Sequence, residues 1–205
     1  VLYSAMSRVE KSMVKGNAAS TDVAVDKAIS AGAVYALNMT GGQKDTAGAA
    51  IDSAWVPVDM AAPAALVGED LAAADALGNL ANPDKLGNPD NLKFSETLRT
   101  LFIGEDSSMH VNNFLWAYNV DTKVLARVLS CPSGAESTGL HAVDSINGFT
   151  YIMSNFQHVG DWEAGLHDKV KPTLDPLVRA NYKDRFGSAV GYLTAAPSAI
   201  KLSKA

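Results

Sequence analysis

Short runs of alternating apolar and polar residues recur along the chain and predict β-strands. The clearest runs lie between residues 88 and 154, and turn residues such as Asn147-Gly148 separate them. Asn-Gly is a preferred hairpin turn because both residues tolerate a positive φ. Short strands joined by hairpin-length turns favour an antiparallel sandwich, barrel or propeller. The expected strands are 1–9, 33–39, 53–60 (an edge or bulged strand, because it contains Pro57), 92–94, 100–104, 113–119, 124–129, 138–143, 149–154 and 189–194.

Two insertions interrupt this β pattern within what we predict to be a single domain over residues 1–205. Residues 61–87 are rich in alanine but broken by glycine and proline, so short helices are expected there. Residues 161–187 carry apolar side chains at helical spacing. Pro172 and Pro176 make an unbroken helix costly, so two short helices are predicted.

The remaining segments carry weaker patterns. Residues 10–31 are small and polar, and they predict a long loop with a short helical turn near 23–28. Residues 195–205 are expected to form a frayed tail. The first residues already alternate as in a strand, so we expect the chain to be part of a longer protein.

Composition narrows the possible functions. Apolar residues make up 47% and charged residues 19% of the 205 residues, which excludes a disordered chain. The net charge of −5, without a basic cluster, argues against nucleic-acid binding. No apolar run is long enough for a membrane-spanning helix. A single cysteine, Cys131, excludes an internal disulfide and any multi-cysteine zinc site, and its context favours a structural thiol. No phosphate-binding loop, dinucleotide fingerprint or hydrolase elbow is present.

Carboxylates follow or precede the strongest strands. Glu105 and Asp106 come directly after the run 100–104, where a hard cation such as Ca²⁺ finds oxygen ligands. A solvated strand end is the alternative. Glu136 lies among small residues ahead of the next strand pair, where backbone can approach a metal cluster or phosphate closely, and a plain turn is equally compatible.

A third polar group follows the run 149–154. Asn155, Gln157 and His158 can act as ligands or as hydrogen-bond donors to an oxyanion, or they can form an ordinary loop. Strand ends of a propeller converge on one face, so Glu105, Glu136 and 155–158 are expected to meet. The remaining histidines show no ligand spacing. His141 favours packing or surface exposure, and His110 is an outside candidate.

Four stretches in this order resemble the C-terminal half of PhoX-type alkaline phosphatases, a bacterial family. They are residues 88–92, 101–106, 134–140 and 151–158. The resemblance extends over roughly residues 1–194. It implies a mainly β fold, namely an antiparallel β-propeller of which this chain forms about three to four blades, with short helical insertions.

The resemblance also implies an activity: a metal-dependent phosphomonoesterase acting on small phosphate esters, with calcium and iron in the propeller centre. Export to the periplasm or medium is implied as well. The positions that match the family pattern imply these roles: Glu105, Glu136, Asp106, Gln157 and, more weakly, Glu10 as metal ligands, and Asn155 and His158 as catalytic residues.

Two departures from the family pattern leave an alternative open. The iron-bridging cysteine of the family belongs to an N-terminal half with no counterpart here, and Cys131 stands in a different context. The expected partner is therefore the missing N-terminal half of the same propeller. The alternative is a non-catalytic, calcium-binding propeller or scaffold module.

Overall fold

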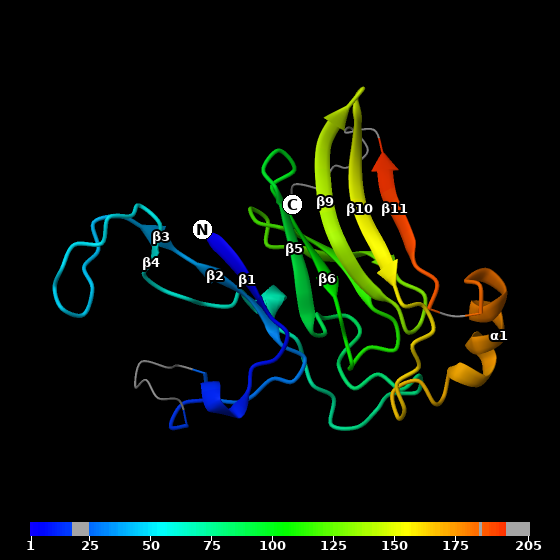
Figure 1. Ribbon diagram of the computed structural model, residues 1–205. Helices are drawn as coiled ribbons and strands as arrows, with labels where there is room; N and C mark the ends of the chain where they lie inside the picture. Colours follow the sequence, from blue (N-terminus) through cyan, green and yellow to red (C-terminus); the bar gives the residue numbers. More distant parts are fainter. Residues whose placement is uncertain (18–24, 185, 196–205) are drawn as a thin grey trace.

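The computed structural model describes residues 1–17, 25–184 and 186–195, and it is mainly β with antiparallel sheets (Figure 1). The largest sheet has four strands in chain order: β5 (Pro89–Ser95), β6 (Thr100–Glu105), β7 (Phe114–Asn119) and β8 (Leu125–Ser130). The second has three: β9 (Glu136–Ile146), β10 (Phe149–Gln157) and β11 (Ala189–Ala195), with β10 in the middle.

Two smaller antiparallel pairs precede these sheets. They are β1 (Leu2–Met6) with β2 (Ala33–Leu37), and β3 (Met39–Thr40) with β4 (Val56–Pro57). The described helices are the 3-10 turns η1 (Lys11–Met13) and η2 (Ala64–Leu66) and the α-helix α1 (Lys171–Asn181). No described helix has the length and apolar character needed to cross a membrane.

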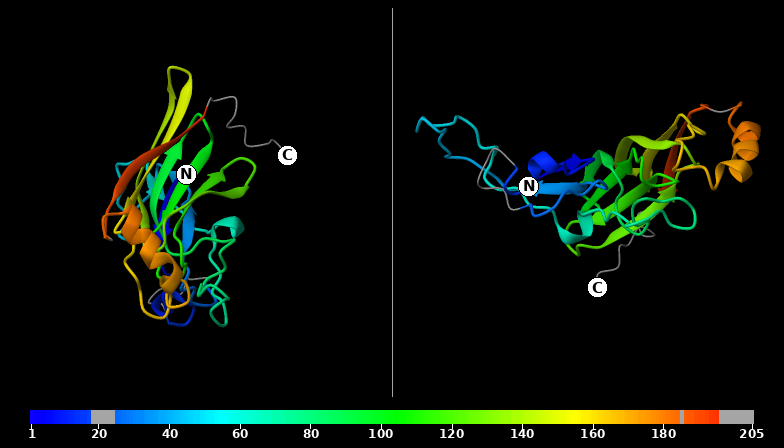
Figure 2. Two further views of the ribbon diagram at one scale, coloured as in Figure 1. Left: turned by 90° about the vertical axis from the view of Figure 1, so that its right-hand side faces the viewer. Right: turned by 90° about the horizontal axis from the view of Figure 1, so that it is seen from below.

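The β1–β2 sheet, the four-stranded sheet and the β9–β10–β11 sheet lie side by side, and their first strands β1, β5 and β9 are adjacent. The strand β5 contacts β1 on one side and β9 on the other, as Figure 1 shows. The hairpin of β3 and β4 projects from one end of the molecule, and α1 lies at the opposite end (Figure 2). Within the described residues these sheets do not close into a ring or a barrel.

The four-stranded sheet is buried on both faces. Successive side chains of its central strands β6 and β7 point to opposite faces, and both strands carry apolar side chains on each face. One face packs against Tyr3, Ala5 and Val34 of the β1–β2 sheet, which we call the first sheet. The four-stranded sheet contributes Leu101, Ile103, Trp116 and Tyr118 to this interface. The other face packs against Ile152 of β10; its own side chains there are Phe102, Leu115 and Ala117. Both interfaces are formed by apolar side chains.

Most predicted strands are confirmed, but two are shorter than predicted, and the segment 61–87 has a single short helix among its described residues where several were predicted. Only Val56 and Pro57 are paired in the expected strand 53–60. The expected strand 33–39 ends at Leu37, and Met39 belongs to the next hairpin. The alanine-rich segment 61–87 contains only η2, because its frequent glycine and proline leave no uninterrupted helical run.

The helix prediction over 161–187 also needs correction, since one helix forms there and not two. Pro172 lies in the first turn of α1, where its missing N–H is not needed. Pro176 lies inside the helix and leaves the Pro172 carbonyl without its helical donor. Pro172 is exposed, so water can reach that oxygen. The predicted tail beyond Ala195 and the start of the predicted turn near 23–28 lie outside the described residues.

Candidate functional site

Glu105 ends β6 and is completely buried. Its carboxylate accepts hydrogen bonds from the backbone N–H of Gly87 (2.8 Å) and Phe114 (3.0 Å). It also accepts one from Trp116 Nε1 (2.7 Å) and lies 3.0 Å from His110 Nδ1. Both carboxylate oxygens of Glu105 therefore have hydrogen-bond partners inside the protein, which indicates a structural role for this residue.

His110 completes that buried network. Its Nδ1 faces the Glu105 carboxylate, and its Nε2 lies 3.2 Å from the carbonyl oxygen of Asn82. Both ring nitrogens of His110 therefore have polar partners inside the protein. The ring packs directly on Gly87, where a Cβ would come within 2.6 Å of it. The pair thus holds the loop that contains Asn82 and Gly87 against the four-stranded sheet.

Asp106, the next residue, faces a different environment. It lies in a cleft of about 520 Å³ into which the end of β6, the end of β10 and the segment after β1 all contribute residues. The lining residues are Arg8, Asp106, Ser107, Ser108, Asn113, Gly134, His158, Asp161, Glu163 and His167. Titratable side chains from separate parts of the sequence therefore share one cavity.

His158 links the end of β10 to the start of the neighbouring strand β9. Its Nε2 lies 3.3 Å from Glu136 Oε2, and its Nδ1 lies 3.1 Å from the carbonyl oxygen of Gly134. A positive φ of 44° turns the chain at His158 immediately after β10. Gly134 also packs on Asp161, where a Cβ would clash with backbone at 2.7 Å. The turn thus places the imidazole at the wall of the cleft.

Glu136 is a largely buried carboxyl with an unusual electrostatic environment. Burial raises the pKa of Glu136, and the negative charge of Asp106 raises it further. The hydrogen bond from His158 opposes these effects. Glu136, at the start of β9, does not line the cleft itself, but its carboxyl is influenced by Asp106 and His158, which do.

The other predicted site residues lie elsewhere. Asn155 is within the β9–β10–β11 sheet, packed on Gly139, and its Oδ1 is buried without a hydrogen-bond partner in the described structure. Gln157 is exposed and pairs with Glu136 across the strands, but it does not line the cleft. Glu10 is exposed just before η1. The structure therefore brings together Asp106, Glu136 and His158.

Sequence reasoning missed several cleft residues. Arg8 follows β1 by two positions, so the strand-end reasoning applied to the later strands would have found it. Asp161 and Glu163 follow His158 in a segment assigned only to helix. His167 accepts the backbone N–H of Glu163 at Nδ1 (2.9 Å), and its Nε2 lies 3.0 Å from the Val111 carbonyl, so this ring is committed to structure.

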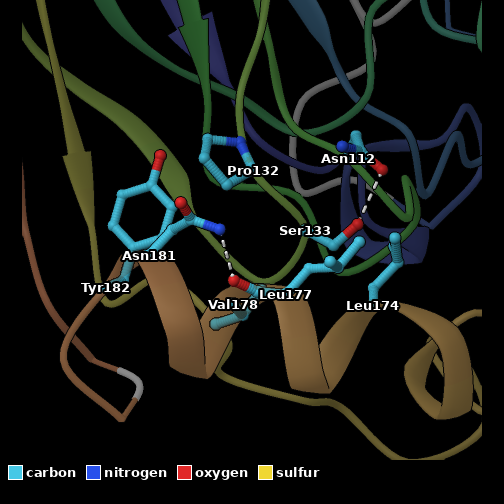
Figure 3. A pocket seen from close by; sticks show the side chains of 8 residues that line it. All are labelled: Asn112, Pro132, Ser133, Leu174, Leu177, Val178, Asn181 and Tyr182. Atoms are coloured by element: carbon cyan, nitrogen blue, oxygen red, sulfur yellow. Dashed lines mark hydrogen bonds between the residues drawn. The ribbon is translucent and has the colours of Figure 1, made fainter.

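A second cavity, of about 390 Å³, lies between α1 and the loops that precede β7 and follow β8 (Figure 3). Leu174, Leu177 and Val178 form its helical wall, and Pro132 and Ser133 face them. Ser133 donates to Asn112 (2.8 Å), which fixes that wall. No acid or histidine lines this cavity, so it lacks the groups that hydrolytic chemistry requires.

Cys131 lies in the apolar cluster beneath α1. Burial raises the pKa of its thiol to about 12, so the thiolate needed for nucleophilic or metal chemistry is not available there. Within the described part of the chain, no three His, Cys, Asp or Glu side chains are grouped so as to hold a metal ion on their own. Searches with family models, among curated proteins and among solved structures found no match.

Proposed function

We propose that this chain is part of a β-propeller phosphomonoesterase that hydrolyses small phosphate esters in the cleft that Asp106 and His158 line. The observation that carries the proposal is that these two side chains, from the ends of β6 and β10, share one cavity, with Glu136 in contact with His158 beside it. The side-by-side placement of β1, β5 and β9 supports the propeller, because blades set their first strands around a common axis.

The acids Asp106, in the cleft, and Glu136, beside it, suit calcium better than iron. Asp106 and Glu136 are oxygen donors whose mutual repulsion a hard cation would relieve. Calcium takes six to eight oxygens, so further ligands would come from water and from additional blades, which we propose as the partner of this chain. Iron would need a thiolate or a group of three ligating side chains, and the described residues provide neither. An iron site would therefore depend on that partner.

The residues of the chain have distinct roles in this proposal. Asp106 and Glu136 would hold the calcium, which supplies positive charge to the phosphoryl oxygens. His158 would keep the Glu136 carboxylate in place through its Nε2 contact, and water would supply both the attacking oxygen and the proton that the departing alkoxide takes up. Glu136 orients the imidazole through the same contact. Export from a bacterial cell is also part of the proposal, and it rests on the family resemblance alone.

Calcium titration combined with a hydrolysis assay tests this function. We expect p-nitrophenyl phosphate hydrolysis to depend on added Ca²⁺ and to disappear with a chelator. Glu136→Gln should weaken calcium binding about tenfold or more, because it removes a charged oxygen ligand. Glu96→Gln makes the same change at an exposed turn and should leave binding and hydrolysis unchanged.

Three outcomes are informative. Calcium binding that depends on Glu136, without hydrolysis, would replace the enzyme with a non-catalytic calcium-binding scaffold. Activity that appears only after iron is added would assign the chemistry to iron. Neither binding nor hydrolysis, in a chain shown to be folded, would contradict the proposal.

A further inference from the structure

The strand β11 forms one edge of the β9–β10–β11 sheet (Figure 1). It pairs with β10 on one side, and within residues 1–17, 25–184 and 186–195 no strand pairs with it on the other. The backbone N–H and C=O groups that point to this free side therefore have no strand to bond there. Such an edge is a template for another extended chain.

Edge strands of natural proteins usually carry a charge or a proline that discourages pairing with another molecule. The other edge strands of the two large sheets are β5, β8 and β9, and each contains at least one charged residue. These residues are Asp90, Lys93, Arg127, Glu136 and Asp144. The sequence of β11, Ala-Val-Gly-Tyr-Leu-Thr-Ala, contains neither a charge nor a proline. This edge therefore lacks the usual protection.

A small apolar cavity lies beside the same edge. It has a volume of about 200 Å³, and its walls include Leu129 of β8, Ile152 and Phe156 of β10, and Gly191 and Leu193 of β11. The space at Gly191 is open, because a Cβ built there would meet no atom within 4 Å. The cavity can thus accept an apolar side chain from a strand added beside β11.

The sequence of β11 suits pairing with itself. Tyr192 is the middle one of its seven residues, so two antiparallel copies related by a two-fold axis would meet at this position. In that register Leu193 of one copy lies opposite Gly191 of the other, on the face of the sheet that borders the cavity. A large side chain therefore meets the open space of a glycine, twice by symmetry, and no like charges oppose each other.

The other face of β11 is also prepared for such a pair. Tyr192 points away from the face of Leu193, and its ring makes an edge-to-face contact with Tyr151, with the ring centroids 5.2 Å apart. The ring of Tyr192 is exposed but already held by its neighbour. At the two-fold axis the Tyr192 rings of two copies would be cross-strand neighbours, and aromatic cross-strand pairs stabilise sheets.

We propose that β11 pairs with β11 of a second copy of this chain. The pairing joins the two three-stranded sheets into one continuous antiparallel sheet, with Leu193 of each copy entering the space beside Gly191 of the other. The inference is independent of the proposed function, because no residue of β11 lines the cleft of Asp106 and His158.

Sedimentation velocity of the full chain over a range of concentrations tests the pairing. We expect a reversible dimer. Tyr192→Lys and Tyr192→Asp should each weaken it about tenfold or more, because like charges would meet at the axis. An equimolar mixture of the two variants should restore the dimer, which a folding defect would not allow. Val128→Lys adds the same charge to an exposed position of the edge strand β8 and should leave the dimer unchanged.

Cysteine cross-linking tests the register. Tyr192→Cys places two thiols opposite each other at the axis, within the Cα separation that a disulfide spans, so mild oxidation should join the chains. Val190→Cys is the matched control on the same exposed face. Its two copies would lie four residues apart along the strands, about 13 Å, and should not join. Burial raises the pKa of Cys131 to about 12, so this thiol does not compete.

The outcomes are distinct. A chain that stays monomeric at every concentration would overturn the inference. A dimer that Tyr192→Lys does not weaken, or that both cysteine variants cross-link equally, would place the interface elsewhere and overturn it as well. Tyr192 is exposed, so its variants should fold, which thermal denaturation verifies. Hydrolysis by a monomeric Tyr192→Lys variant, or a dimer without hydrolysis, would separate this inference from the proposed function.

Discussion

Glu105 and Asp106 show how two adjacent carboxylates acquire different roles. Glu105 is the last residue of β6 and shares a face with Leu101 and Ile103, so the pleat directs it into the core. There its oxygens accept hydrogen bonds from backbone and indole and contact the imidazole of His110. Asp106 lies beyond the strand and lines the cleft. Glu105 is therefore a structural acid, and Asp106 is a candidate ligand.

Replacing Glu105 with glutamine should destabilise the protein strongly. The glutamine amide would place N–H groups against donors that now meet carboxylate oxygens, which breaks a buried hydrogen-bond network. Each buried polar group left without a partner costs about 1–3 kcal/mol in the free energy of unfolding. Asp106→Asn, one residue away and exposed, should change it by less than about 0.5 kcal/mol. Urea denaturation of both variants, without calcium, measures the difference, and equal effects would contradict a structural role for Glu105.

At the scale of elements, Asp144 joins two sheets. It lies on β9 and accepts a hydrogen bond from Ser95, at the end of β5. The hydrogen bond from Ser95, followed by those from Thr97, lowers the pKa of Asp144 below its ordinary value of 3.8. A carboxyl with a lowered pKa in the folded state stabilises the fold above its unfolded pKa and loses that contribution as the pH falls.

The expected effect of Asp144→Asn therefore depends on pH. At pH 7 the variant should lose about 1–2 kcal/mol of unfolding free energy, the value of hydrogen bonds to a charged group. The gap between the two proteins should shrink as the pH falls through and below about 4, where the native carboxyl becomes protonated. Denaturant unfolding at a series of pH values measures this, with Glu96→Gln as a control in the neighbouring turn. A gap that stays constant down to pH 3 would exclude the linkage.

At the scale of the whole molecule, the four-stranded sheet is the centre of the structure. The first sheet covers one of its faces and the β9–β10–β11 sheet covers the other, each through an apolar core. Because neither core is complete without the central sheet, we expect the three sheets to unfold together. The projecting hairpin of β3 and β4, with Trp55 75% exposed, lies outside these cores.

Ile152→Ala tests that cooperativity. Ile152 is buried on β10 against Phe102 and Leu115 of the central sheet, so its truncation should cost about 2–5 kcal/mol. Val190→Ala, on the adjacent strand but 76% exposed, should cost less than about 0.5 kcal/mol. Fluorescence and circular dichroism should report one shared transition for the Ile152 variant. Two separate transitions would show that the sheets fold independently.

The strands and their turns were largely predictable from the sequence. Period-two alternation is a local signal, and the runs 100–104 and 113–119 carry it clearly enough to place β6 and β7 almost to the residue. The polar strand ends were equally visible, which is why Asp106, Glu136 and His158 were among the candidates. All of these features depend on residues that are close in the chain.

Tertiary structure decided which of those candidates share a site. Nothing local to Glu105 indicates that Gly87, Phe114 and Trp116 would surround it, because these donors come from other segments. Arg8 reaches Ser108 across 100 positions of sequence. The single helix α1, despite its two prolines, likewise depends on packing, since Val178 anchors it on the core around Cys131. Alternation along a strand is set by the backbone of that strand, whereas burial and the convergence of side chains are set by which sheets pack together.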